Sequence, residues 1–193
     1  EDTLEGNITA DRTISAANKN FLKGFVYVKS GATLTIEAGS VIKGISVASG
    51  ERAASLIIEP GAKIIAEGTV DKPIVFTSDK EPGKRVTGDW GGLIICGNAR
   101  VNRTNQPTIE GGPGTHYGNT TSDEFNGESS GKLKYVRIEF AGYPLEPDKE
   151  INGLTFGGVG SGTEVEFVQV SYSNDDSYEW FGGTVNAKHL IAY

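Results

Sequence analysis

Three acidic residues and one side-chain amide lie close together in the stretch SNDDSYEWFGG, positions 173–183. Carboxylate and amide oxygens are the hard ligands that calcium prefers, and a turn followed by a strand can supply them. The sequence therefore indicates a calcium site made of Asn174, Asp175, Asp176 and Glu179. The spacing matches neither an EF-hand nor a nonapeptide β-roll repeat, so the alternative is a solvated acidic turn closed by two glycines.

Aromatic side chains form a second candidate site. A flat ring can stack on the apolar face of a sugar while neighbouring amides or carboxylates hydrogen-bond the sugar hydroxyls. On this basis the predicted glycan contacts are Trp90, Tyr143, Tyr178 and Trp180, with Phe181 beside them. The alternative is that the two tryptophans cover strand ends or pack beneath a loop, since large aromatic side chains are commonly buried.

Catalysis has weaker support from the residues. Arg137, Glu139 and Gln169 are expected on one outward column, where a polysaccharide lyase could place its base. That column lacks the carboxylates such an enzyme needs, and Arg137 can instead pair with Glu139. His116 and His189 have no neighbouring Ser or Cys that would indicate a hydrolase. We assign no catalytic residue, and a polysaccharide lyase or hydrolase is the alternative function.

Composition limits the classes of protein and partner. The 193 residues suit one domain, and 18 basic against 25 acidic residues give a net charge of −7, which argues against a nucleic-acid partner. The longest apolar runs fall far short of the roughly 20 residues of a membrane-spanning helix. Cys96 is the single cysteine and lies in the apolar run GLIICGN, so we expect it in the core.

Glycines recur in register with aliphatic residues. The segments 28–34, 36–42 and 58–64 share one pattern, in which two residues separate a central glycine from an aliphatic residue on either side. Ile36 lies 22 positions before Ile58, and VEFVQVSYS at 165 begins 22 before AKHLIAY at 187. Short strands with a repeat of this length predict a solenoid with rungs of about 22 residues, because no single turn can bury its own apolar face.

Alternation within the strands supports the same prediction. In LKYVRIEF, Val136, Ile138 and Phe140 are expected to point inward, with Arg137 and Glu139 outward. The pattern repeats in VEFVQVSY, where Tyr172 is the last residue expected inward. Stacked strands of this kind would align such residues in columns.

The chain reads as a single domain, 1–193, with two special segments. Residues 1–24 precede the first clear repeat and are expected to form an amino-terminal cap or arm. Residues 99–131 are rich in turn formers and predict a long loop, because the strand pattern resumes at Leu133. The last strand, at 187–193, would leave an unpaired edge. A second copy could pair with it in a homo-oligomer or fibre, the chain could have lost further rungs, or the 99–131 loop could cover the edge.

Several stretches together resemble a known family. They are GDWGGLIICGNA at 88–99, LKYVRIEFAGY at 133–143, the segment 150–193, and GATLTIEAGSVIKG near the amino terminus. These are similar to secreted or surface-anchored proteins of Bacteroidota-type bacteria that form right-handed parallel β-helices of the pectate-lyase-like class. The resemblance implies an all-β right-handed parallel β-helix and a place outside the cell or on its surface, more than an activity.

The combined prediction is a non-catalytic structural or binding protein. Its expected partners are a polysaccharide or surface glycan, or further copies of the chain in a fibre. Calcium is the one cofactor that the residues indicate.

Overall fold

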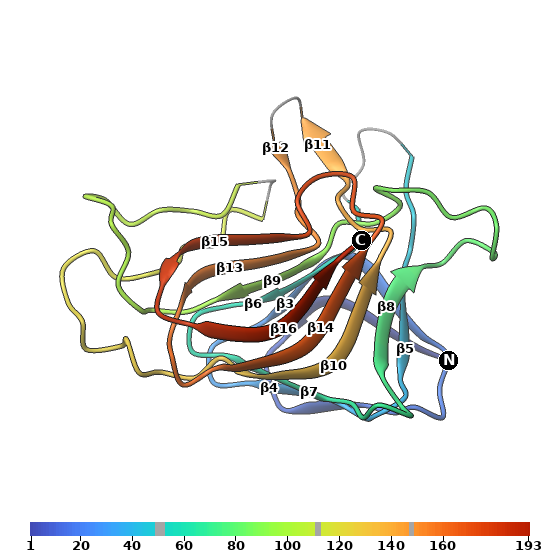
Figure 1. Cartoon of the computed structure of the whole chain (residues 1–193), viewed down its shortest axis with the longest axis horizontal. Coiled ribbons are helices and arrows are strands. Elements are labelled where there is room, and N and C mark those ends of the chain that lie inside the picture. The colour runs from blue at the N-terminus through green and yellow to red at the C-terminus, as the bar shows by residue number, and fades with distance from the viewer. Residues whose placement is uncertain (49–52, 111–112, 147–148) are drawn as a thin grey trace.

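Short strands wind around a common axis and stack side by side in the computed structural model of the chain (Figure 1). The structure describes residues 1–48, 53–110, 113–146 and 149–193. Within these ranges, fourteen strands form one sheet, and a separate antiparallel pair joins β11 (Pro144–Glu146) to β12 (Lys149–Glu150). The described residues include no helix that is long and apolar enough to cross a membrane. The prediction of an all-β parallel β-helix is confirmed.

Three columns of strands, named here the first, second and third faces, make up the helix. The first face consists of β2 (Arg12–Ile14), β4 (Thr33–Ile36), β7 (Lys63–Glu67) and the starts of β10 (Gly131–Glu139), β14 (Glu164–Ser171) and β16 (Asn186–Ala192). The second face consists of the starts of β1 (Asp2–Ile8) and β3 (Asn20–Val28), then β5 (Val41–Gly44), β8 (Ile74–Ser78) and the ends of β10, β14 and β16. The third face consists of the ends of β1 and β3, then β6 (Ser55–Ile58), β9 (Leu93–Cys96), β13 (Leu154–Val159) and β15 (Tyr178–Gly183).

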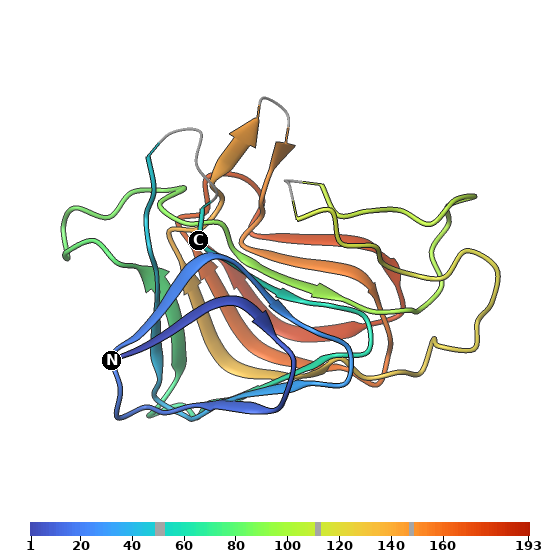
Figure 2. The same cartoon turned by 180° about the vertical axis from the view of Figure 1, so that it is seen from behind.

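Residues 1–24, expected to be a cap or arm, supply β1, β2 and the start of β3. Figure 2 shows these strands, in blue, lying at one end of the solenoid. Leu4, Ile8 and Ile14 from this segment are buried in the interior. The segment is therefore packed as the first part of the helix.

On the first face the repeat is 22 residues at both ends of the helix; it is 18–20 between β1 and β3, 24 between β13 and β15, and longer in the middle. Arg12 pairs with Leu34, and Val165 pairs with Ala187, each 22 positions apart. Between them, Val28 pairs with Ile58 at an offset of 30. The 22-residue spacing between Ile36 and Ile58 does not correspond to a stacked pair, because Ile36 pairs with Ala66, and Ile58 pairs with Val28 and Ile95.

The interior is filled by aligned apolar side chains, one column for each inward position. One such column on the second face contains Ile42, Phe76, Ile138 and Val170, each at most 2 % exposed. This burial follows from period-two alternation, which sends every second side chain of a strand to the same side. The expected inward positions of Val136 and Ile138 are confirmed.

The corners of the helix depart from the expected alternation. Phe140 and Tyr172 were expected inward, but they lie after β10 and β14 with positive φ, and their rings stack 5.1 Å apart. At the corner between the first and second faces, Tyr135, Phe167 and His189 also have positive φ and stack on one another. A left-handed residue turns the chain sharply at a cost of about 1–2 kcal/mol, and ring stacking offsets part of that cost.

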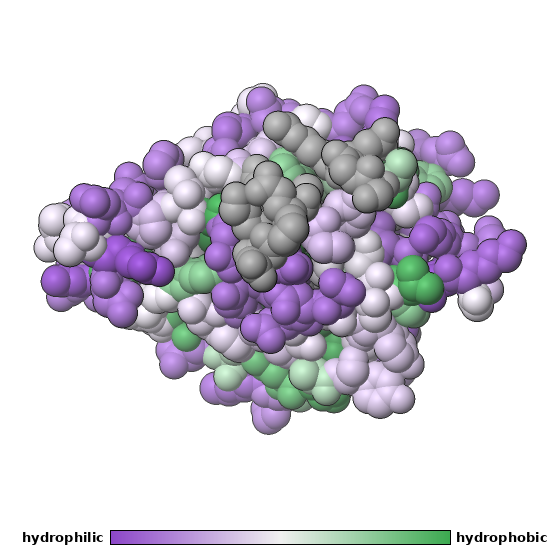
Figure 3. All heavy atoms as spheres, turned by 90° about the horizontal axis from the view of Figure 1, so that it is seen from above, coloured by the Kyte–Doolittle hydropathy of each residue, from purple (hydrophilic) through white to green (hydrophobic). Residues whose placement is uncertain are grey.

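Residues 97–130 form the long loop that the sequence predicts, between β9 and β10. Figure 3 shows the molecule from above, with this loop at the left end, where hydrophilic residues dominate the surface. Val101, Ile109 and Tyr117 anchor the loop in a second apolar cluster against the outer side of the third face. Cys96 belongs to this cluster, and burial raises the pKa of its thiol.

Candidate functional site

Two of the four predicted glycan contacts are core residues. Trp90 has no exposed surface, stacks on Phe76, and donates a hydrogen bond from its indole nitrogen to the Glu139 carbonyl at 2.7 Å. Tyr143 is 9 % exposed, and its hydroxyl donates to the Ala48 carbonyl at 3.0 Å. Neither ring is open to a sugar, so these two predictions are corrected: the rings stabilise the fold.

The other two predicted contacts lie on the inner side of β15. Trp180 pairs in register with the buried Phe156 and stacks on its ring 5.5 Å away. Tyr178 packs against the same interior cluster, and its hydroxyl lies 2.7 Å from the Val168 carbonyl. Trp180 nevertheless keeps 44 % of its surface exposed, since β15 is the last described strand of the third face. The outer side of β15 is instead formed by Glu179 and Phe181.

Glu179 is the unusual acid of this region. Its carboxylate accepts a hydrogen bond from the side-chain amide of Asn152, which is 3 % exposed. Burial, followed by the nearby charges of Glu110, Asp176 and Asp175, raises the pKa of Glu179 to about 7. Desolvation and like charges both disfavour an ionised carboxylate, which explains the direction.

The predicted calcium ligands are not gathered around one point. Asn174, Asp175 and Asp176 are exposed between β14 and β15, and the Asn174 side chain lies 3.5 Å from the Thr87 hydroxyl. Among the residues that the structure describes, no group of three or more His, Cys, Asp or Glu side chains could hold a metal ion. The arrangement corresponds to the alternative drawn from the sequence, an acidic turn at the surface.

The outward column on the second face is held by one ion pair and by hydrogen bonds. Arg137 contacts the Glu139 carboxylate at 2.5 Å, and Thr77 donates to the same carboxylate at 3.1 Å. Gln169 donates to the Ser171 hydroxyl at 2.8 Å. Each charged group is therefore satisfied by its neighbours, as the non-catalytic interpretation of this column expects.

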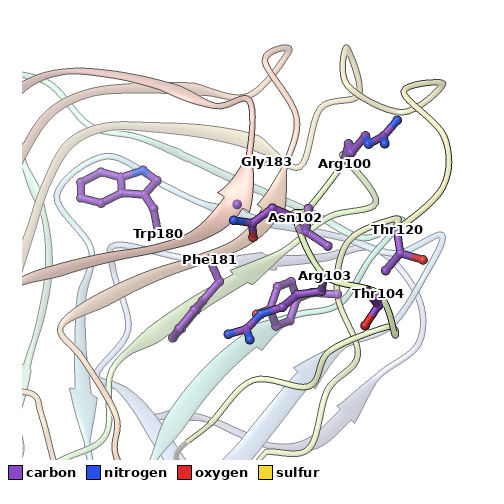
Figure 4. A pocket seen from close by; sticks show the side chains of 11 residues that line it. Arg100, Asn102, Arg103, Thr104, Thr120, Trp180, Phe181 and Gly183 are labelled. Carbon is purple, nitrogen blue, oxygen red and sulfur yellow. The ribbon is translucent and has the colours of Figure 1, made fainter.

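A hollow of about 700 Å³ opens between β15 and the long loop (Figure 4). Its described lining residues are Arg100, Val101, Asn102, Arg103, Thr104, Tyr117, Thr120, Trp180, Phe181, Gly182 and Gly183. We name it the arginine hollow. Figure 4 shows Phe181 and Arg103 directed to the same side of β15, with the Trp180 ring directed away from them. The Phe181 ring is half-buried and lies 5.8 Å from the ring of Tyr117.

The charge of this hollow is opposite to that of the chain. Arg100 pairs loosely with Asp123 at 3.3 Å, and both side chains are largely exposed. Arg103 forms no hydrogen bond or ion pair with any described residue. None of the described lining residues carries a carboxylate. A guanidinium held open in this way can bind a carboxylate or a similar anion with two parallel hydrogen bonds.

The glycines after Trp180 explain how β15 can approach the loop. Gly182 and Gly183 have φ of +67° and +84°. A Cβ at Gly182 would lie 2.7 Å from a methyl of Val101, and one at Gly183 would lie 2.5 Å from the Val159 carbonyl. The EWFGG stretch therefore has a structural reason, because only glycine allows both the turn and the close packing.

Sequence reasoning found the loop and Trp180 but missed the two arginines and Phe181 as partners. The available signal was the stretch ARVNRTN, which places two arginines close together in an acidic chain. Nothing in the local sequence indicates that this stretch lies against β15, about 80 positions later. Phe181 was noted among the aromatics but was not separated from the inward-facing Trp180.

The chain is a parallel β-helix in which the long loop packs on the third face and forms the arginine hollow with β15. A family model described as the pectate-lyase-like β-helix domain matches residues 6–193, and the chain belongs to this family. The comparisons with curated proteins and with solved structures gave no match.

Proposed function

We propose that the protein binds an acidic glycan in the arginine hollow and does so without catalysing a reaction. The observation that carries the proposal is Arg103, whose guanidinium pairs with no described residue and lies in a hollow without a carboxylate among its described lining residues, on a chain of net charge −7. An anionic ligand is the chemistry that such a site favours.

A sugar fits the remaining lining residues. Asn102, Thr104 and Thr120 offer amide and hydroxyl groups for the ligand hydroxyls, and the half-buried Phe181 ring offers an apolar surface. Sites for sugars combine such rings with a few polar groups. The described lining residues include no Asp, Glu, His or Lys, the side chains that most often act as acid or base, which supports binding rather than catalysis.

The proposed location is outside the cell or on its surface. It rests on the similarity of the GDWGG and EWFGG stretches to secreted proteins. On the first face, Lys132 lies between Glu67 and Glu164, which is the mixed charge expected of a surface without a binding role.

The test is a glycan array, run with and without calcium, followed by calorimetric titration of the bound glycans. Arg103→Ala should weaken binding of acidic glycans at least about tenfold, because a charged hydrogen-bonded pair is lost. Lys63→Ala is the matched control, since it removes one exposed positive charge on the first face. Equal affinities for the wild type and Arg103→Ala would contradict the proposal.

A further inference from the structure

Two more hollows adjoin the arginine hollow along the same loop. The middle hollow, of about 340 Å³, is lined by Asn98, Gln106, Gly118, Asn119, Thr120 and Phe125, and it shares Thr120 with the arginine hollow. The far hollow, of about 480 Å³, shares Asn98 and Gln106 with the middle one. Shared lining residues place the three hollows in a row.

The row runs across the strands of the third face. The far hollow reaches Asn7 on β1 and Tyr27 on β3, and the arginine hollow reaches β15 at the other end of that face. The strand order β15, β13, β9, β6, β3, β1 contains five spacings. At about 4.8 Å each, the row is about 24 Å long, which exceeds what a single sugar can occupy.

Each hollow combines an aromatic ring with polar groups. The middle hollow has Phe125, which is 38 % exposed, beside Asn119, whose side-chain nitrogen donates to no described residue. The far hollow has the half-buried Tyr27 ring beside the exposed polar side chains of Asn7 and His116.

The charges along the row are uneven. The described lining residues of the middle hollow include no charged side chain. In the far hollow, Lys29 is paired with Glu59 at 2.5 Å, so this pair offers no net charge. Arg103, which forms no hydrogen bond or ion pair with any described residue, lies at the arginine end of the row.

From this arrangement we infer that the three hollows form one groove for an oligosaccharide, with an acidic unit at the arginine end and neutral sugars along the rest. A uniformly acidic polymer would place its further charges where the described lining residues offer no unpaired Lys or Arg. The inference rests on the proposed function and adds the length, the direction and the charge pattern of the ligand.

The experiment uses the whole chain and a length series of one acidic probe. The probes are the disaccharide glucuronosyl-xylose and the same unit extended by two and by four neutral xylose residues, with trigalacturonate as the uniformly acidic comparison. Calorimetry measures each affinity for the wild type and for Gln106→Ala. Gln106 is exposed, and its only described hydrogen bond is a 3.4 Å contact with the Gly118 carbonyl, so the substitution leaves the core intact.

In the wild type, extending the disaccharide by neutral xylose residues should raise the affinity about tenfold, because the added sugars form further hydrogen bonds in the groove. Gln106→Ala should lose this gain while binding the disaccharide normally, and trigalacturonate should bind no better than the disaccharide. Asn105→Ala, an exposed neighbour outside all three lining sets, is the control and should keep the gain.

The possible failures are distinguishable. Equal affinity for short and extended probes, together with a loss in Arg103→Ala, overturns the groove and leaves the proposed function standing. A Gln106→Ala variant that weakens the disaccharide as much as the extended probes also overturns the groove. If no probe binds, or if every probe binds Arg103→Ala with the same affinity as the wild type, the proposed function itself is contradicted.

Discussion

The carboxyl of Glu179 should make the stability of the protein depend on pH near neutrality. Its pKa rises from 4.5 to about 7 in the folded chain, through burial and through Glu110, Asp176 and Asp175. Between these values the folded state binds more protons than the unfolded state, so the free energy of unfolding falls as the pH rises from about 4.5 to about 7. The contribution is fully present below this range and absent above it.

The magnitude follows from the size of the shift. A shift of about 2.5 pKa units corresponds to about 3.4 kcal/mol at 1.36 kcal/mol per unit. Glu179 is only partly buried, and solvent screening reduces the expected contribution to about 1–2 kcal/mol. For a chain of this length, that difference shifts the melting temperature by about 2–8 °C.

The assay is thermal unfolding from pH 5 to pH 8 for the wild type and Glu179→Gln. The amide cannot ionise and can still accept the hydrogen bond from Asn152. We expect similar stability of the two proteins near pH 5 and a more stable variant near pH 8. Glu124→Gln, which changes an exposed carboxylate in the long loop, is the control and should follow the wild type. Parallel curves for the wild type and Glu179→Gln would refute the reasoning.

Four further expectations concern the fold and its partners. Phe167→Gly should be more stable than Phe167→Ala by about 1 kcal/mol, because φ of +54° favours glycine; the reverse order in denaturant titrations would contradict the corner geometry. Gly131→Ala should lower the free energy of unfolding by more than about 3 kcal/mol, because Gly131 has a φ of +115° and an added Cβ would collide with the Ile64 backbone. Gly127→Ala is the control and should change little in the same titration, because Gly127 has open space around it. Neither calcium nor a chelator should change the melting temperature, because the predicted calcium ligands do not lie around one point. A melting temperature that rises with calcium, and no longer does so in the Asp175→Asn, Asp176→Asn double variant, would contradict this expectation and support the calcium site. If the edge of β16 pairs with a second copy, light scattering should show a mass that grows with concentration, and a constant monomer mass would exclude the predicted fibre.

Local sequence determined the strands and the class of fold. Period-two alternation identifies the inward residues Val136 and Ile138, and the short repeats with glycine turns exclude a structure in which one rung is stable alone. The apolar run around Cys96 also identifies a core position. These features depend on near neighbours along the chain, so they can be recognised without the tertiary structure.

The corners and the stacking offsets needed the structure. Alternation continues only while the backbone stays extended, and a single left-handed residue such as Phe140 ends the strand and turns the chain. The number of residues in each turn then decides which side the next strand presents. That is why Trp180 faces the interior while Glu179 faces outward, a choice that the stretch SNDDSYEWFGG does not contain.

The candidate site was decided by the tertiary structure alone. Arg103 and Phe181 are far apart in the sequence, and they meet because the long loop packs Val101 and Tyr117 against the outer side of the third face. Docking of a loop depends on the shape of the surface that receives it, and that surface comes from strands of several different rungs. Residue types could show that the loop carries cations, and only the fold could show which side chains stand beside them.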